Sequence, residues 1–129
     1  MLPRRTYGAL LAEALVSFLI FLVATMSLYG LLATARRSQA RARQLTAASQ
    51  LGRELLERYR ARSFADITPG LEKGRVRLET RRDNLPGVLV LDYQVEVSSG
   101  PGNLKSVMAT VWWTQEPAGK VEMESYVGP

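Results

Sequence analysis

Apolar residues fill one continuous stretch of the chain, from residue 9 to residue 35. The only charged residue within it is Glu13. A helix of this length would reach about 40 Å, enough to cross a hydrocarbon core of about 30 Å with some tilt. A core helix of a soluble protein is rarely apolar on all sides over such a length. The pattern therefore predicts a transmembrane helix over residues 9–35.

After residue 35 the apolar residues become periodic. They recur at intervals of three or four, at Leu45, Ala48, Leu51, Leu55 and Tyr59. This spacing predicts an amphipathic helix over residues 36–64 that continues the first one, giving a single helix from residue 9 to about residue 64. Its apolar side must be covered by another part of the chain.

Four later segments have the character of strands: residues 75–80, 88–97, 105–114 and 120–127. Turn-forming residues separate them, at 83–87, 98–103 and 116–119. The pattern predicts a β domain over residues 65–129, an antiparallel sheet of about four strands with one face free for the helix. The expected fold class is α+β.

Two features of this β domain predict how it packs. About 65 residues is marginal for an independent domain, so packing on Leu51, Leu55 and Tyr59 should be essential to its stability. Trp112 and Trp113 are adjacent and must face opposite sides of a strand. One of them is expected in the core, and the other partly exposed in the sheet or in contact with a partner.

Composition narrows the possible chemistry. The chain has no cysteine and no histidine, which excludes disulfides, thiolate nucleophiles, Ser-His-Asp triads and ordinary zinc sites. Glu116, Glu122 and Glu124 are expected on a solvated face and not in a metal cluster. We therefore expect no catalytic residues, no cofactor and no metal, and a protein that is not an enzyme.

The net charge of +5 is concentrated in one band. Residues 36–62 hold eight arginines against Glu54 and Glu57. Basic residues beside an apolar span commonly contact lipid headgroups, and the same band could instead hold nucleic acid by its phosphates. Both interpretations involve the arginines nearest the apolar segment: Arg36, Arg37, Arg41 and Arg43.

The apolar segment could be processed in three ways. It could be a secretory signal cut after Ala35, although it is longer than a usual signal core and carries Glu13. It could be an uncleaved bitopic anchor, whose flanking arginines would then favour a cytoplasmic C-terminal part. It could also be cut before residue 9 and remain on the mature protein. A carboxylate at Glu13 is costly in lipid unless it reaches the headgroups or meets a cation.

The residues around Glu13 carry a family resemblance. A short leader with Arg4 and Arg5 ends in Gly8, an apolar helix starts at Ala9, and Glu13 is the fifth residue after Gly8. This arrangement resembles the type IV pilin family, although its members most often have Phe where this chain has Ala9. The segment from Val111 to Tyr126 also resembles the last strands of minor pilins and minor pseudopilins.

The resemblance implies cleavage of the leader, residues 1–8, between Gly8 and Ala9 by a prepilin peptidase, usually followed by methylation of the new N-terminus. It implies that Glu13 pairs with that N-terminal amine on a neighbouring subunit. It also implies single-pass placement in a bacterial inner membrane, with a cytoplasmic N-terminus, an exported C-terminal domain, and other pilin subunits and an inner-membrane assembly platform as partners.

The predicted function is a minor pilin or minor pseudopilin that primes or caps a type IV pilus-like filament. A type IV pilus, a type II secretion system and a DNA-uptake apparatus all remain possible. Two alternatives stay open: a competence pilin that binds DNA through the band from Arg36 to Arg62, and an uncleaved bitopic membrane adaptor.

Overall fold

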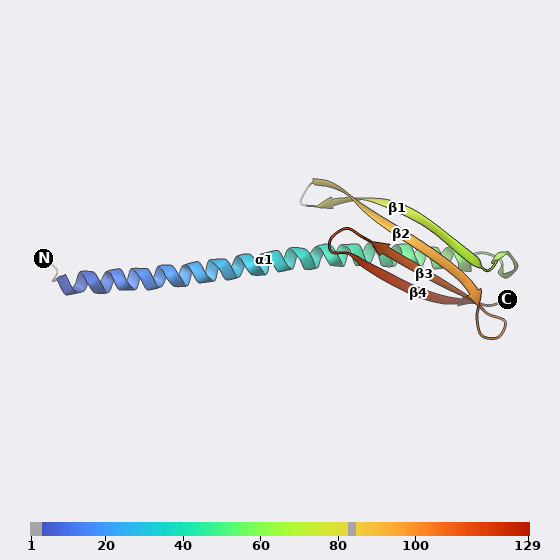
Figure 1. Cartoon of the computed structure of the whole chain (residues 1–129), viewed down its shortest axis with the longest axis horizontal. Helices are drawn as coiled ribbons and strands as arrows, with labels where there is room; N and C mark the ends of the chain where they lie inside the picture. The colour runs from blue at the N-terminus through green and yellow to red at the C-terminus, as the bar shows by residue number, and fades with distance from the viewer. Residues whose placement is uncertain (1–3, 83–84) are drawn as a thin grey trace. The chain divides into compact units, whose positions relative to one another are not determined.

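The computed structural model describes residues 4–82 and 85–129. It contains a helix α1 (Arg4–Arg60), a short 3-10 helix η1 (Phe64–Asp66), and strands β1 (Gly70–Arg82), β2 (Leu85–Ser99), β3 (Lys105–Trp113) and β4 (Gly119–Val127) (Figure 1). The chain divides into two compact units, Met1–Gln39 and Ala40–Pro129. The α+β fold class expected from the sequence is confirmed.

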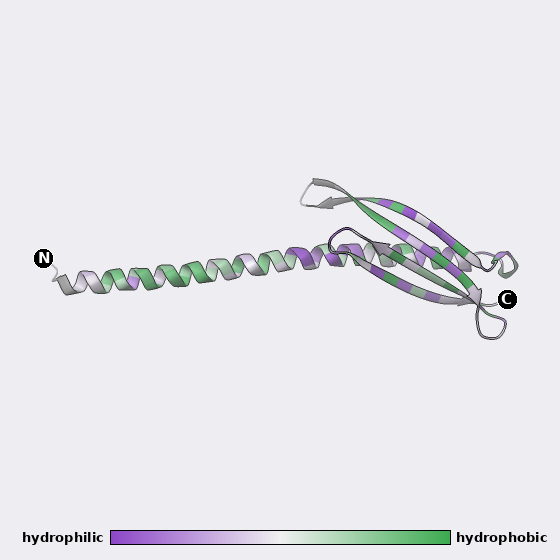
Figure 2. Cartoon of the chain, viewed as in Figure 1, coloured by the Kyte–Doolittle hydropathy of each residue, from purple (hydrophilic) through white to green (hydrophobic). Residues whose placement is uncertain are grey.

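The first unit consists of the N-terminal part of α1. From residue 6 to residue 39 every side chain is exposed except that of Thr25, which is half-buried. Green, hydrophobic residues predominate along this part of the helix in Figure 2, with a few purple or pale residues between them. Its hydroxyl groups bond to carbonyls one turn earlier: Thr25 to Phe21 at 2.8 Å, Ser27 to Val23 at 2.8 Å and Thr34 to Gly30 at 3.0 Å. By length and composition, this helix could cross a membrane.

The second unit combines the C-terminal part of α1 with the sheet. The strands form an antiparallel meander in the order β1-β2-β3-β4, in which Gly70 pairs with Val97 and Asp92 with Trp112. Hydrophobic and polar residues alternate along much of the strands, as the banding in Figure 2 shows, and successive residues of a strand face opposite sides of the sheet. One face packs on α1 and the other is open to solvent.

The core of this unit lies between α1 and the sheet. Its buried apolar residues are Ala48, Leu55, Leu56, Tyr59, Ile67, Leu89, Leu91, Val95, Val97, Val107, Ala109, Val111 and Trp113. Leu51 is partly buried against them. Each fully buried large aliphatic side chain stabilises the fold by about 1.5–3 kcal/mol, so α1 contributes a substantial share of the core, as the apolar stripe predicts.

The structure corrects the predicted stripe at Leu45, which is 48% exposed. Gln44 faces the sheet in its place, because its side-chain oxygen accepts a hydrogen bond from Trp113 Nε1 at 3.1 Å. Adjacent residues of a helix lie about 100° apart. With Gln44 turned to the sheet, Leu45 is left on the flank of the helix.

The helix also ends earlier than expected, at Arg60 and not near Phe64. Ile67 must reach the core, where it is 1% exposed, so the chain has to leave the helical path. Lys105 stabilises the segment that follows the helix, since its Nζ donates to the carbonyls of Phe64 at 2.6 Å and Ile67 at 2.5 Å. These bonds fix the connection between α1 and β1.

The strands confirm the predicted sheet and lengthen it. β1 starts at Gly70 and not at residue 75, and β2 begins at Leu85, inside the turn predicted over 83–87, of which residues 83 and 84 lie outside the described part of the chain. Trp113 is the core tryptophan at 4% exposed, and Trp112 is half-buried on the opposite face.

Candidate functional site

The residues of the pilin-like motif lie on one helical segment of the first unit. Gly8, Ala9 and Glu13 all belong to α1 and are all exposed. Ala9 and Glu13 are four residues apart, so they share one face of the helix and differ in height by about 6 Å. A Cβ atom added at Gly8 would meet nothing within 4 Å. A larger side chain at position 8 would therefore have open space around its Cβ atom.

Glu13 has no cationic partner among the side chains that the structure describes. The first described cation that follows it is Arg36, 23 residues further along the helix, which corresponds to about 35 Å. No ion pair of Glu13 occurs within the described residues. A carboxylate exposed between Ala12 and Ala14 in an apolar segment must find headgroups or a cation from another molecule.

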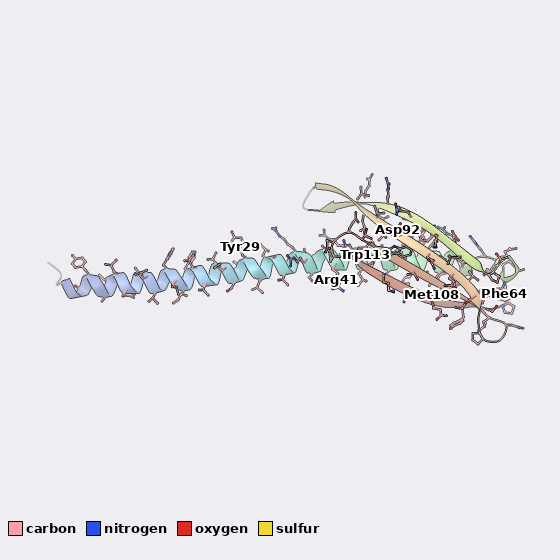
Figure 3. The ribbon with its side chains drawn as sticks, viewed as in Figure 1. Tyr29, Arg41, Phe64, Asp92, Met108 and Trp113 are labelled. Atoms are coloured by element: carbon pink, nitrogen blue, oxygen red, sulfur yellow. The ribbon has the colours of Figure 1, made fainter. Side chains whose placement is uncertain are left out.

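The arginines nearest the apolar segment are also exposed. Arg36 and Arg37 belong to the first unit, Arg41 and Arg43 to the second, and Figure 3 shows the side chain of Arg41 directed away from the helix. Within each pair the side chains point in clearly different directions, because residues one or two apart lie about 100° or 200° around a helix. None of the four forms an ion pair with a described residue.

The distal part of the arginine band is engaged within the second unit. Arg58 lies 3.5 Å from Glu54, and Arg60 lies 2.8 Å from Glu57. Arg60 also donates to the hydroxyl of Ser125 on β4, and Arg62 stacks 4.6 Å from the centre of the Tyr59 ring. Within the band, Arg58, Arg60 and Arg62 thus contact other residues of the second unit, whereas Arg36, Arg37, Arg41 and Arg43 form no ion pair with a described residue.

Two polar contacts between α1 and the sheet were not foreseen from the sequence. Tyr59 donates its hydroxyl hydrogen to Glu72 of β1, and Trp113 Nε1 donates to Gln44 and to the carbonyl of Pro117 at 2.8 Å. Burial, followed by the hydrogen bond to the Glu72 carboxylate, raises the pKa of Tyr59 above 10.0. The apolar stripe of the helix predicts polar residues such as Gln44 on the opposite face, so no local pattern indicated either contact.

The open face of the sheet holds a shallow hollow between β1, β2 and β3. It is lined by Lys73, Gly74, Arg75, Asp92, Tyr93 and Trp112. Arg75 Nε donates to Asp92 Oδ1 at 2.6 Å, and this bond raises the pKa of Arg75. The open, solvent-exposed hollow offers a charged surface and no enclosed site for a small molecule.

The three glutamates that the sequence analysis expects on a solvated face, Glu116, Glu122 and Glu124, have exposed side chains. Lys120 pairs with Glu122 at 2.9 Å, and Glu124 accepts a hydrogen bond from Ser106 Oγ at 2.6 Å. Glu116 is exposed in the loop between β3 and β4. Across residues 4–82 and 85–129 no group of three acidic side chains is placed to hold a metal ion.

No protein-family model, no curated protein and no solved structure matches the chain. Its functional interpretation therefore depends on the motif around Gly8 and Glu13 and on the two structural units.

Proposed function

We propose that the chain is a subunit of a type IV pilus-like filament, more specifically a minor pilin or pseudopilin that primes or caps it. The observation that carries the proposal is Glu13, which has no cationic partner among the described side chains and lies one helical turn after Ala9 on an exposed apolar helix. Cleavage after Gly8 would release an amine at Ala9, which can supply the missing cation to Glu13 of a neighbouring subunit. The exposed side chains of residues 6–39 support packing against lipid first and against other such helices afterwards.

The separation of the chain into two units supports the same role. An anchor with exposed apolar side chains suits a subunit that is held in a membrane before assembly, whereas the second unit has its own core. Assembly would then place the first unit among its neighbours and leave the sheet unit at the surface. The proposed placement is a bacterial inner membrane, with a cytoplasmic N-terminus and an exported sheet unit.

Processing is the first test. Intact-mass measurement of the membrane-extracted protein should give a chain that begins at Ala9. Gly8→Leu should block the cut without disturbing the helix, because nothing lies within 4 Å of an added Cβ. A mature protein beginning at Met1 or at Arg36 would contradict the proposal.

The charge of Glu13 is the second test. Glu13→Gln keeps the shape but removes the charge, and it is easier to bury in lipid than a carboxylate. We expect cleaved, membrane-inserted protein that co-purifies poorly with the other subunits. Ser17→Ala, one turn further along the same helix, is the matched control and should assemble normally. Wild-type assembly of Glu13→Gln would reduce Glu13 to a boundary residue at the headgroups.

A second candidate function rests on the four free arginines. Arg36, Arg37, Arg41 and Arg43 are exposed and make no ion pair with a described residue, so they could hold the phosphates of DNA in a competence pilin. Such binding would ignore base sequence and would weaken steeply with salt. Replacing the four with glutamine should abolish it, whereas replacing Arg58 and Arg60, which are engaged within the sheet unit, should weaken it far less.

A further inference from the structure

The two edges of the sheet carry side-chain rows of opposite character. On the open face of β1, the β1 row consists of Lys73, Arg75, Arg77 and Glu79. On the same face of β4, the β4 row consists of Lys120, Glu122, Glu124 and Tyr126. Both strands are edges, because the sheet order is β1-β2-β3-β4, and all eight side chains are exposed.

Intramolecular bonds leave much of these rows available. Arg75 is paired with Asp92, Lys120 with Glu122, and Glu124 with Ser106. The Tyr126 hydroxyl group is also hydrogen-bonded to Glu124. Lys73, Arg77 and Glu79 form no ion pair with any described residue. Exposed pairs such as Lys120 with Glu122 contribute little stability and can be exchanged for others.

Charged edges usually protect a sheet from joining another sheet. In this sheet, charge repulsion disfavours contact only between two copies of the same edge. Two β1 rows would bring basic side chains together, and two β4 rows would bring glutamates together. A β1 row facing a β4 row instead brings unlike charges together. The sheet is thus complementary to a second copy of itself.

The order of charges selects one alignment. When β4 of one copy runs antiparallel to β1 of the next, with Glu124 opposite Arg75, Glu122 falls opposite Arg77. In the same alignment Lys120 falls opposite Glu79 and the Tyr126 ring opposite Lys73. Three opposite-charge pairs and one cation-aromatic pair form, with no like charges in contact.

Other alignments are poorer. A shift of two residues in one direction places Lys120 against Arg77, and a shift in the other direction places Glu122 against Glu79. No parallel alignment forms more than two opposite-charge pairs. Electrostatics therefore favours a single register.

We propose that the β1 row of one copy contacts the β4 row of a second copy in this antiparallel register. The contact joins unlike edges, so it leaves one free edge on each end copy and can repeat along an assembly. This inference rests on the proposed filament function and deepens it, because it requires at least two copies side by side. A strictly single-copy tip subunit would not use it.

The chain has no cysteine, so introduced thiols report the contact without background. Leu71→Cys with Gly128→Cys places two thiols opposite each other in the proposed register and keeps every charge of both rows. Leu71→Cys with Val88→Cys is the matched control, since Val88 is 52% exposed on β2, which is not an edge. In full-length protein in membranes, oxidation should give disulfide-linked dimers and longer oligomers for the first pair only. Equal yields from the two pairs would overturn the contact.

A charge swap tests the register in the same background. Glu122→Arg should lower the crosslinking yield about tenfold, because it changes an opposite-charge pair into a like-charge pair. Adding Arg77→Glu to the same chain should restore the yield. Glu96→Lys, an equivalent reversal on the central strand β2, should have little effect. A loss that Arg77→Glu does not rescue, or an equal loss with Glu96→Lys, would contradict the register.

Intact mass measured on the same samples separates this inference from the proposed function. Protein that is cleaved after Gly8 but does not crosslink overturns the edge contact and leaves the filament function standing. Protein that crosslinks but begins at Met1 supports the edge contact and contradicts the filament function.

Discussion

In residues 6–39 large apolar side chains such as Phe18 and Leu28 are 59% and 67% exposed, whereas in residues 40–129 Leu55 and Leu91 are 1% and 0% exposed. Both units contain large apolar side chains, but only in the second unit does a sheet cover the apolar side of the helix. The first unit is helical with its backbone satisfied internally, and its apolar surface needs lipid or other subunits. The comparison indicates that the stability of the second unit is intrinsic, whereas the state of the first depends on its surroundings.

The largest expected effect comes from cutting the chain at the two ends of the amphipathic helix. A fragment of residues 36–129 retains α1 from Arg36 to Arg60 and should fold cooperatively. A fragment of residues 64–129 loses Ala48, Leu55, Leu56 and Tyr59 from the core and should remain unfolded. Far-UV circular dichroism with thermal melting distinguishes them. A well-folded 64–129 fragment would show that the sheet does not need the helix.

Single core substitutions sharpen the contrast between buried and exposed leucines. Leu55→Ala should lower the free energy of unfolding of the 36–129 fragment by about 2–5 kcal/mol, because it leaves a cavity between helix and sheet. Leu45→Ala, at a side chain that is 48% exposed, should change it by less than about 1 kcal/mol. Urea unfolding measures both. Equal effects would contradict the observed orientation of the helix.

Two glycines test the same comparison across the two units. A Cβ at Gly119 would lie 2.6 Å from Trp113 Cζ2, and the Trp113 ring is held by hydrogen bonds to Gln44 and Pro117. Gly119→Ala should therefore destabilise the sheet unit by about 1–3 kcal/mol. Gly30→Ala meets nothing within 4 Å and should stabilise the helix by about 1 kcal/mol. In thermal melting of the full-length protein in detergent, Gly119→Ala should lower the melting temperature of the sheet unit and Gly30→Ala should raise that of the helix.

The smallest effect concerns Tyr59 and depends on pH. Since burial and Glu72 raise its pKa above 10.0 in the folded protein, the folded state holds the phenolic proton more tightly than the unfolded state. The resulting stability is complete below pH 10 and is lost as the pH rises through the folded pKa. Tyr59→Phe should cost about 1–2 kcal/mol at neutral pH and should flatten the decline in stability above pH 10.

A matched control for this prediction is Tyr126→Phe. Tyr126 is 50% exposed, and its pKa is raised by a hydrogen bond to Glu124 and by the charge of that group. Its replacement should change stability at neutral pH much less than Tyr59→Phe. Urea unfolding between pH 8 and 11 measures the free energy of unfolding of both variants. If this free energy falls with rising pH in Tyr59→Phe as steeply as in the wild-type protein, Tyr59 is not the source of the decline.

The helix, the four strands and most of the helical stripe could be predicted from the sequence, because each depends on a local period of apolar residues. It also specified Gly8, Ala9 and Glu13 as a motif, since only their spacing along one segment matters. Ala48, Leu55 and Tyr59 were placed in the core for the same reason. Their helical period places them on one side of the helix, and the antiparallel sheet has one apolar face on which that side can pack.

The contacts between side chains of different elements could not be predicted in this way. The choice of Trp113 over Trp112 depends on which face of β3 packs on α1, and the exposure of Leu45 depends on where Gln44 finds a partner. The end of the helix depends on Ile67 and Lys105, which are 38 residues apart in the chain. Contacts between such distant residues follow from packing and register, which no local pattern encodes. The opposed charge rows on β1 and β4 likewise become one surface only when the strand order is known.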